Sequence, residues 1–207
     1  MDNYYTQQII TYMGNKRKVL PHIEEIINIV RANLGKDKLS IADGFSGSGI
    51  VSRLFKNYAQ ELYVNDIAGY SKTINSCYLA TPNTDTQNTI KKYIDTANLY
   101  ADNNNNNVNK FIQLYWAPKG DKPKVGERVY YTRENAQRID RYRYYITTIP
   151  REYRPYLLAP LLVEASKHNN CSGHFAAFYK KDNIGHFGGK NNIDIKRITQ
   201  KIELPMP

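Results

Sequence analysis

The sequence predicts an α/β fold that begins a doubly wound parallel sheet. A short apolar segment at 39–43 runs directly into a glycine-rich turn, "GFSGSG", and a helical pattern follows at 50–59. A second apolar segment at 61–66 comes next and ends, like the first, in a carboxylate. Two strands joined through a helix need a crossover connection, so this order indicates neighbouring parallel strands.

A helix is expected before the first strand. Apolar residues at 23, 26, 27, 30 and 34 recur at the spacing of one helical face. Pro21 suits the first turn of this helix, and Gly35 suits the residue that ends it. After the second strand, helical patterns return around 68–79 and 86–100.

The chain changes character at 102–110, "DNNNNNVNK", where a run of Asn favours turns over regular structure. A loop rich in Pro, Gly and Lys is expected at 117–127. Two long helices should follow, the first capped by Thr132, and Pro160 should kink the second. The last segment, from about 173, mixes aromatic residues, glycines and lysines and is expected to form strands and loops.

Positive charge is concentrated in the second half of the chain. Residues 1–109 hold 11 Lys and Arg against 10 Asp and Glu, whereas residues 110–207 hold 18 against 9. A positive field of this kind attracts polyanions, because neutralised phosphates release their counterions. Residues 110–207 are therefore the expected nucleic-acid-binding part.

Composition excludes several other classes of protein. No apolar run approaches the roughly 20 residues of a membrane span, and the acidic start lacks the pattern of a signal peptide. Cys77 and Cys171 are far apart in the sequence, so free thiols and a cytoplasmic location are expected. The His and Cys residues show no metal-ligand spacing, so we expect no metal site.

The glycine turn is typical of a site for an adenosine-containing ligand. Gly47 and Gly49 allow close approach of the backbone, but Ser52 stands where a dinucleotide fingerprint has its third glycine. Asp66, at the end of the next strand, is placed to accept hydrogen bonds from ribose hydroxyls. S-adenosylmethionine fits this pattern better than a dinucleotide, and a nicotinamide-dependent oxidoreductase is the less favoured alternative.

Three motifs together resemble the Dam-like family of DNA N6-adenine methyltransferases. They are "TYMGNK" ahead of the first helix, "DGFSGSG" after the first strand and "NDI" after the second. The segments at 130–140, 156–181 and 201–207 resemble the middle region of a subgroup of these enzymes. The resemblance implies S-adenosylmethionine as cofactor, double-stranded DNA as substrate, and direct attack by adenine N6 on the methyl group. The residues that it assigns to the cofactor are Tyr12, Gly14, Asn15, Lys16, Asp43, Phe45, Ser46, Gly47, Gly49, Asp66 and Ile67.

The resemblance also implies a domain organisation. Residues 1–101 would form the cofactor-binding part of an incomplete Rossmann-like S-adenosylmethionine-dependent methyltransferase core. Residues 102–200 would form a largely helical, basic insertion that recognises the DNA target, and residues 201–207 would return towards the core. The candidates for DNA contacts, chosen on charge, are Arg133, Arg138, Arg141, Lys180, Lys181 and Lys190.

The family's catalytic motif, Asp/Asn-Pro-Pro-Tyr/Phe, is absent from these 207 residues, in which no two prolines are adjacent. No catalytic residue is therefore assigned. We expect the N-terminal part or a subunit of a split or truncated methyltransferase, inactive until a second polypeptide supplies the motif. The alternative is a DNA-binding or regulatory protein that kept the fold and lost catalysis.

Overall fold

The computed structural model describes residue 4 and residues 9–10, 16–103, 108–120, 122–171 and 177–207. The chain divides into two compact units, residues 1–81 and 82–207. The division falls before the helix expected at 86–100, because that helix packs within the second unit. The boundary between compact units therefore lies about 20 residues before the functional boundary predicted at 101/102.

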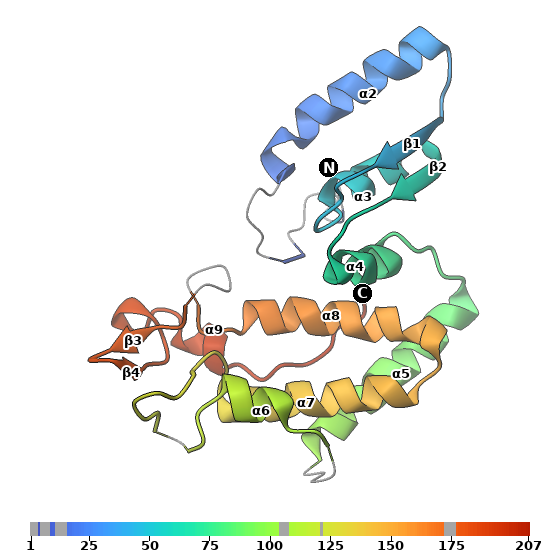
Figure 1. Ribbon diagram of the computed structural model, residues 1–207. Coiled ribbons are helices and arrows are strands. Elements are labelled where there is room, and N and C mark those ends of the chain that lie inside the picture. The colour runs from blue at the N-terminus through green and yellow to red at the C-terminus, as the bar shows by residue number, and fades with distance from the viewer. Residues whose placement is uncertain (1–3, 5–8, 11–15, 104–107, 121, 172–176) are drawn as a thin grey trace. The chain divides into compact units, whose positions relative to one another are not determined.

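The first unit holds the expected strand–helix–strand arrangement (Figure 1). The 3-10 helix η1 (Lys16–Val19) leads into α2 (Leu20–Leu34), which ends at Gly35 in the left-handed conformation, with φ 60°. Strand β1 (Leu39–Asp43) and strand β2 (Ala59–Val64) pair in parallel, with Ile41 opposite Leu62, and α3 (Ile50–Lys56) connects them. Helix α4 (Gly69–Tyr78) follows β2.

The helix between the strands is shorter than the sequence pattern predicted. Helix α3 ends at Lys56, and β2 begins at Ala59 and ends at Val64 rather than at Asp66. The reason is that the carbonyl of Tyr58 already accepts a hydrogen bond from Leu39 N at 2.9 Å. The chain has therefore joined the sheet at that point, and Asp66 lies in the turn beyond it.

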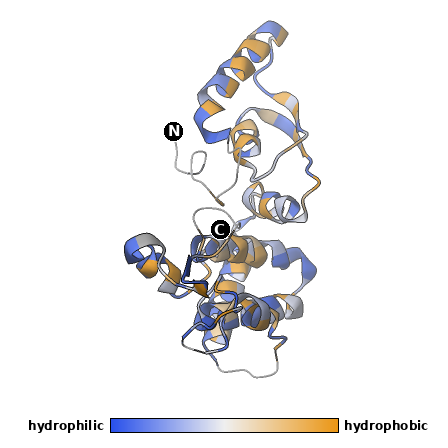
Figure 2. Ribbon diagram, turned by 60° about the vertical axis from the view of Figure 1, so that its left-hand side comes forward, coloured by the Kyte–Doolittle hydropathy of each residue, from blue (hydrophilic) through white to orange (hydrophobic). Residues whose placement is uncertain are grey.

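The core of the first unit is small. Leu20 and Ile27 of α2 pack with Ile50 and Leu54 of α3. Hydrophobic residues recur along α2 (Figure 2). Among the hydrophobic residues of this helix, Ile26 and Leu34 are 60% and 58% exposed. Helices α2 and α3 thus form this core beside the sheet. Within the described residues, no strand other than β1 and β2 belongs to that sheet.

The second unit is built on three helices, α5 (Thr84–Asp102), α7 (Arg133–Thr148) and α8 (Arg154–Lys167), with α6 (Phe111–Trp116) packed on α7. Thr132 caps α7 as expected, accepting a hydrogen bond from Asn135 N at 3.2 Å. Helix α8 follows the 3-10 helix η2 (Arg151–Tyr153) and continues past Pro160. The core shared by these helices includes Ile94, Tyr142 and Leu157.

The C-terminal segment is more helical than expected. It forms a short hairpin of β3 (Lys180–Lys181) and β4 (Ile184–Gly185), then the 3-10 helix η3 (Lys190–Asn192) and α9 (Ile195–Thr199). The prediction of strands and loops alone was wrong for α9, which buries Ile198. Ile202 and Leu204 then belong to the core of the second unit.

Candidate functional site

The glycine turn follows β1 and is shaped by left-handed backbone at Gly47 (φ 51°) and Gly49 (φ 74°). Ser46 N donates to Asn65 O at 3.0 Å, and Gly49 N donates to Ser46 O at 2.7 Å. A side chain at Gly49 would also meet its surroundings, because an added Cβ would lie 2.1 Å from Asn75 Oδ1. Glycine at this position is therefore required by both conformation and space.

Asp66 holds this turn from the end of β2. Its carboxylate accepts a hydrogen bond from Gly47 N at 2.7 Å and another from Ala68 N at 2.8 Å. The N–H groups of Ala68 and Gly47 lower the pKa of Asp66, so the carboxylate is ionised at neutral pH. Each oxygen has used one of its acceptor positions, and each has another left for a ligand hydroxyl.

Asp43 holds the start of α3 in a similar way. The hydroxyl of Ser52 donates to Asp43 Oδ2 at 2.5 Å, and Phe45 N donates to Asp43 Oδ1 at 3.3 Å. Ser52, which stands where a dinucleotide fingerprint has its third glycine, is fully buried. The serine that replaces the third glycine of that fingerprint therefore supports this turn through its hydrogen bond to Asp43.

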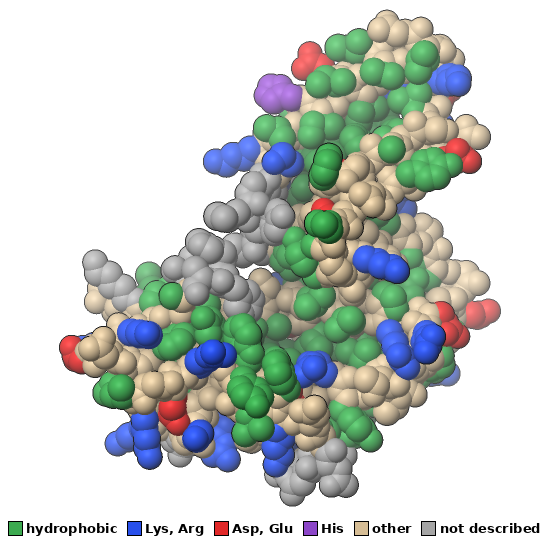
Figure 3. Space-filling model, viewed as in Figure 1, with side chains coloured by type: hydrophobic (Ala, Val, Ile, Leu, Met, Phe, Trp, Pro, Cys, Tyr) green, Lys and Arg blue, Asp and Glu red, His purple; other side chains and the backbone are tan. Residues whose placement is uncertain are grey.

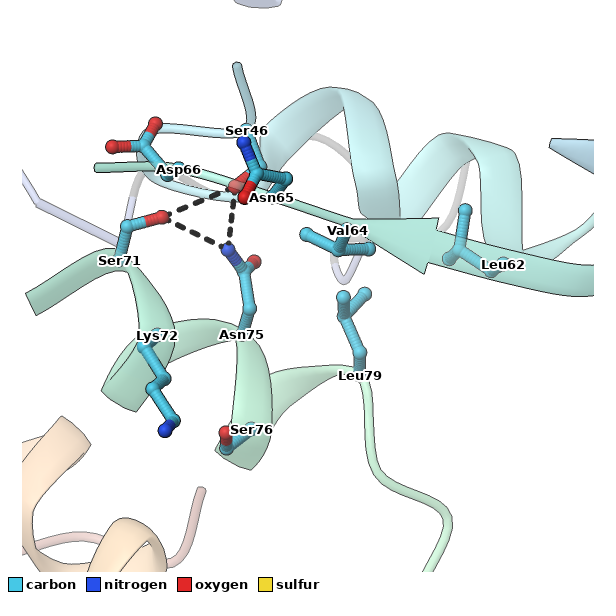
Figure 4. Close-up of a pocket in the computed structure, with 10 residues that line it drawn as sticks. All are labelled: Ser46, Leu62, Val64, Asn65, Asp66, Ser71, Lys72, Asn75, Ser76 and Leu79. Atoms are coloured by element: carbon cyan, nitrogen blue, oxygen red, sulfur yellow. Dashed lines mark hydrogen bonds between the residues drawn. The ribbon is translucent and has the colours of Figure 1, made fainter. Parts of the chain in front are cut away.

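A polar cluster on α4 supports the turn from below. Asn75 Nδ2 donates to the hydroxyls of Ser46 and Ser71 at 2.9 and 3.1 Å, and those two hydroxyls are 3.1 Å apart (Figure 4). Beside this cluster lies a pocket of about 470 Å³, lined by Ser46, Leu62, Val64, Asn65, Asp66, Ser71, Lys72, Asn75, Ser76 and Leu79. The pocket opens next to the carboxyl end of β2, the edge at which open α/β sheets bind ligands.

Sequence reasoning missed Ser71 and Asn75. The signal available was two polar residues four positions apart on a predicted helix, where they share one face. That face is turned towards the glycine turn, and both residues are buried.

Two apolar side chains flank the site and are almost fully exposed. Phe45 lies in the turn after β1 and is 96% exposed, and Ile67 follows Asp66 and is 103% exposed. Neither is among the buried hydrophobic residues of the first unit, so their apolar surface is available to a ligand or partner. Their assignment to the cofactor site stays a prediction.

The segment ahead of the first helix that was predicted to belong to the cofactor site lies largely outside the described residues. Tyr12, Gly14 and Asn15 fall in the segment 11–15, about which the structure gives no description. Lys16 is exposed and begins η1. The structure therefore brings together Asp43, Phe45, Ser46, Gly47, Gly49, Asp66 and Ile67.

The candidates for DNA contacts separate into two groups, and Arg138 is the clearest correction. Its side chain is only 3% exposed, it pairs with Asp102, and its Nε donates to Ile202 O at 2.7 Å. Arg141 donates to Ala101 O at 2.9 Å and is half-buried. Arg138 therefore stabilises the helical unit and is not presented to a polyanion; charge alone could not reveal this.

The remaining candidates lie at the surface. Arg133 is exposed at the start of α7, and Lys180 and Lys181 are exposed on β3. Lys190 begins η3, and its side chain is not among those described. A hollow of about 490 Å³ lies beside the hairpin, lined by Tyr179, Lys180, Lys181, His186, Gly189, Asn191 and Asn192.

Two kinds of feature are absent from the part of the chain that the structure describes. No helix in that part of the chain is both long and apolar enough to cross a membrane. No group of three or more His, Cys, Asp or Glu side chains there is arranged to hold a metal ion.

Similarity to known proteins is extensive along the chain. Modification methylase LlaI of Lactococcus lactis subsp. lactis is 31% identical over 180 residues, which cover 82% of this chain and 27% of that protein. Type II methyltransferase M.NlaIII of Neisseria lactamica is 29% identical over 177 residues, covering 83% of this chain and 49% of the relative. Type II methyltransferase M.CviAII of Paramecium bursaria Chlorella virus 1 is 30% identical over 177 residues, covering 83% and 50%.

This chain therefore spans half or less of the length of each of these relatives. No solved structure matches it significantly. The model of one protein family, the D12 class N6 adenine-specific DNA methyltransferases, matches residues 12–203. The resemblance inferred from the three motifs is thereby confirmed, and the chain belongs to the D12 class N6 adenine-specific DNA methyltransferase family.

Proposed function

We propose that this chain carries the S-adenosylmethionine-binding part and the DNA-recognition part of a site-specific DNA adenine-N6 methyltransferase. The observation that carries the proposal is the turn after β1, held by Asp66 and flanked by the exposed side chains of Phe45 and Ile67. Family membership supports the same reaction class. Double-stranded DNA is the proposed partner of the second unit.

The chemistry of these residues fits S-adenosylmethionine. The free acceptor positions of the Asp66 carboxylate suit the two hydroxyls of a ribose. The apolar side chains of Phe45 and Ile67 suit contact with a flat base such as adenine. The left-handed glycines leave the backbone free of side chains where a ligand would approach. S-adenosylmethionine, when bound, supplies a methyl group on a positively charged sulfur.

These residues do not supply a group that holds the acceptor base. An enzyme that acts on a base within duplex DNA needs a pocket for the extruded nucleotide. The Asp/Asn-Pro-Pro-Tyr/Phe motif that would build it is absent from the 207 residues. We therefore propose that methyl transfer requires this motif from outside them, either from more of the same protein or from a second polypeptide.

Binding of S-adenosylmethionine, measured by isothermal titration calorimetry with NAD as comparison, tests the first part of the proposal. Binding of the former alone is expected. Phe45→Ala should weaken it, whereas Tyr63→Ala, a matched change at another exposed aromatic residue (62%), should not. No binding of S-adenosylmethionine, or unchanged binding after Asp66→Ala, would refute the assignment of this site.

Transfer of a tritiated methyl group to duplex DNA tests the second part. The chain alone should transfer none, and addition of a polypeptide that carries the motif, such as the remaining half of a type II relative, should restore transfer. If DNA and S-adenosylmethionine both bind yet no complement restores transfer, the alternative of a catalytically inert DNA-binding protein is favoured.

A further inference from the structure

The loop of residues 117–128, called here the 117–128 loop, is described at 117–120 and 122–128, where hydrogen bonds hold it at its base and within it. Trp116 O accepts hydrogen bonds from Tyr130 N at 3.0 Å and Tyr131 N at 3.1 Å, which closes the loop at its base. Within it, the Glu127 carboxylate accepts hydrogen bonds from Lys124 N at 2.8 Å and Lys119 N at 3.2 Å. The N–H of Lys124, above all, lowers the pKa of Glu127, so this clamp persists at neutral pH.

The 117–128 loop is joined to the β3–β4 hairpin. Val125 pairs with Ile184 in an antiparallel bridge. Just beyond the loop, the rings of Tyr130 and Phe178 meet edge to face, with centroids 5.0 Å apart. The loop and the hairpin therefore present one continuous surface, although more than 50 residues separate them in the sequence.

This surface is basic, and within the described residues Lys180 alone of its cations lies over an aromatic ring, that of Phe178, 5.1 Å from its centroid. Together, residues 117–128 and 178–186 hold six Lys and Arg against three Asp and Glu, a net charge of +3. Within the described residues, none of the six forms an ion pair. Figure 3 shows Lys and Arg side chains gathered over the part of the second unit where the loop and hairpin lie. The exposed cations are Lys119, Lys122, Lys124, Arg128, Lys180 and Lys181.

We propose that the 117–128 loop is a phosphate-contacting element for duplex DNA and acts beside the hairpin. This inference rests on the proposed function, because it assumes that the second unit binds DNA. Lys122 and Lys124 are point charges on flexible stems, which suit phosphate oxygens better than base edges. A loop already ordered by Glu127 loses little conformational freedom on binding. The loop thus contributes affinity that is independent of DNA sequence.

The salt dependence of DNA affinity tests the inference. Each phosphate contact contributes about 0.9 to the slope of log affinity against log salt concentration. Lys122→Gln with Lys124→Gln should therefore reduce the slope by about 1.8, which is roughly tenfold less loss of affinity between 50 and 200 mM salt. The matched control is Lys91→Gln with Lys92→Gln, two exposed lysines of α5 in the same unit.

The outcomes separate the inference from the proposed function on which it rests. A reduced slope for the loop variant alone, equal on two duplexes of unrelated sequence, supports the loop as a phosphate contact. Wild-type protein that binds DNA, with both variants unchanged, overturns the inference and leaves the proposed function standing. Wild-type protein that shows no salt-dependent DNA binding overturns both.

Discussion

Gly49→Ala is the substitution that most directly probes how the glycine turn is built. Alanine at a φ of 74° costs about 1–2 kcal/mol, because left-handed backbone brings Cβ against the carbonyl oxygen. The new Cβ would also lie 2.1 Å from Asn75 Oδ1, so the Asn75 side chain must move. Moving it breaks the hydrogen bonds to Ser46 and Ser71, at about 0.5–1.5 kcal/mol each.

The expected loss of stability is therefore about 2–5 kcal/mol in the first unit. Hydrogen exchange is the suitable assay, because it reports on each unit separately. Amides of β1 and α4 should exchange at least about 30-fold faster in Gly49→Ala than in the wild type. Binding of S-adenosylmethionine should weaken in parallel.

Gly44→Ala is the matched control, since no atom lies within 4 Å of its added Cβ and its φ is not in the left-handed range. It should change stability by less than about 0.5 kcal/mol. The double variant Gly49→Ala with Asn75→Ala should cost less than the sum of the two single changes, because both disrupt the same contact. Equal exchange rates for Gly44→Ala and Gly49→Ala would refute this account of the turn.

Three other predictions concern charge and burial. The N–H groups of Ala68 and Gly47 lower the pKa of Asp66, so its stabilisation is present above the unfolded carboxyl pKa of about 3.9 and is lost as pH falls through the lower native pKa. Asp66→Asn should therefore flatten the acid limb of urea unfolding below about pH 4, and an unchanged limb would contradict the clamp. Arg138→Ala should lower the free energy of unfolding by about 1–3 kcal/mol, because it removes the buried donor to Ile202 O, and it should not change the salt slope of DNA binding. The exposed Arg133→Ala should reduce that slope. Burial raises the pKa of Cys77 to about 12, and that of Cys171 to about 11, so neither thiol should react with Ellman's reagent at neutral pH before the protein unfolds.

The sequence was informative wherever a local rule decides the structure. Apolar spacing and Gly35 located α2, and Thr132 located the start of α7, because helical periodicity and caps involve neighbouring residues. The end of α3 was misplaced because it depends on a partner strand: Tyr58 is held in the sheet by Leu39. Similarly, α9 was missed because its stability comes from burying Ile198 in the second unit.

At the candidate site, too, contacts between residues that are distant in the sequence could not be predicted. The turn, Asp43 and Asp66 were predicted from the sequence to form a ligand-binding pattern. That Asp66 clamps the turn through Gly47 N could not, since the two residues lie 19 positions apart and only the parallel pairing of β1 and β2 brings them together. Asp66 would therefore serve two tasks, shaping the turn and meeting the ligand, and a substitution there affects both.

Charge is the property for which sequence and structure differ most. The excess of Lys and Arg after residue 110 indicated a polyanion-binding part, but much of that charge maintains the fold. The reason is that guanidinium groups hold several carbonyls at once, as Arg197 does with Lys167 O and Asn169 O. The cations of the second unit that bond to its carbonyls or carboxylates include Arg138, Arg141, Arg143, Arg154, Lys167, Arg197 and Lys201.

The exposed cations of the second unit are mainly lysines, and six exposed cations lie on the 117–128 loop and the hairpin. If the second unit binds DNA, the field that attracts it therefore comes from exposed side chains, such as those of the 117–128 loop, the hairpin and Arg133, rather than from Arg138 and Arg141 of α7. A count of charges along the chain cannot make this distinction. It depends on which side chains find carbonyls and carboxylates within the unit, and those partners, such as Ile202 O for Arg138, lie far away in the sequence.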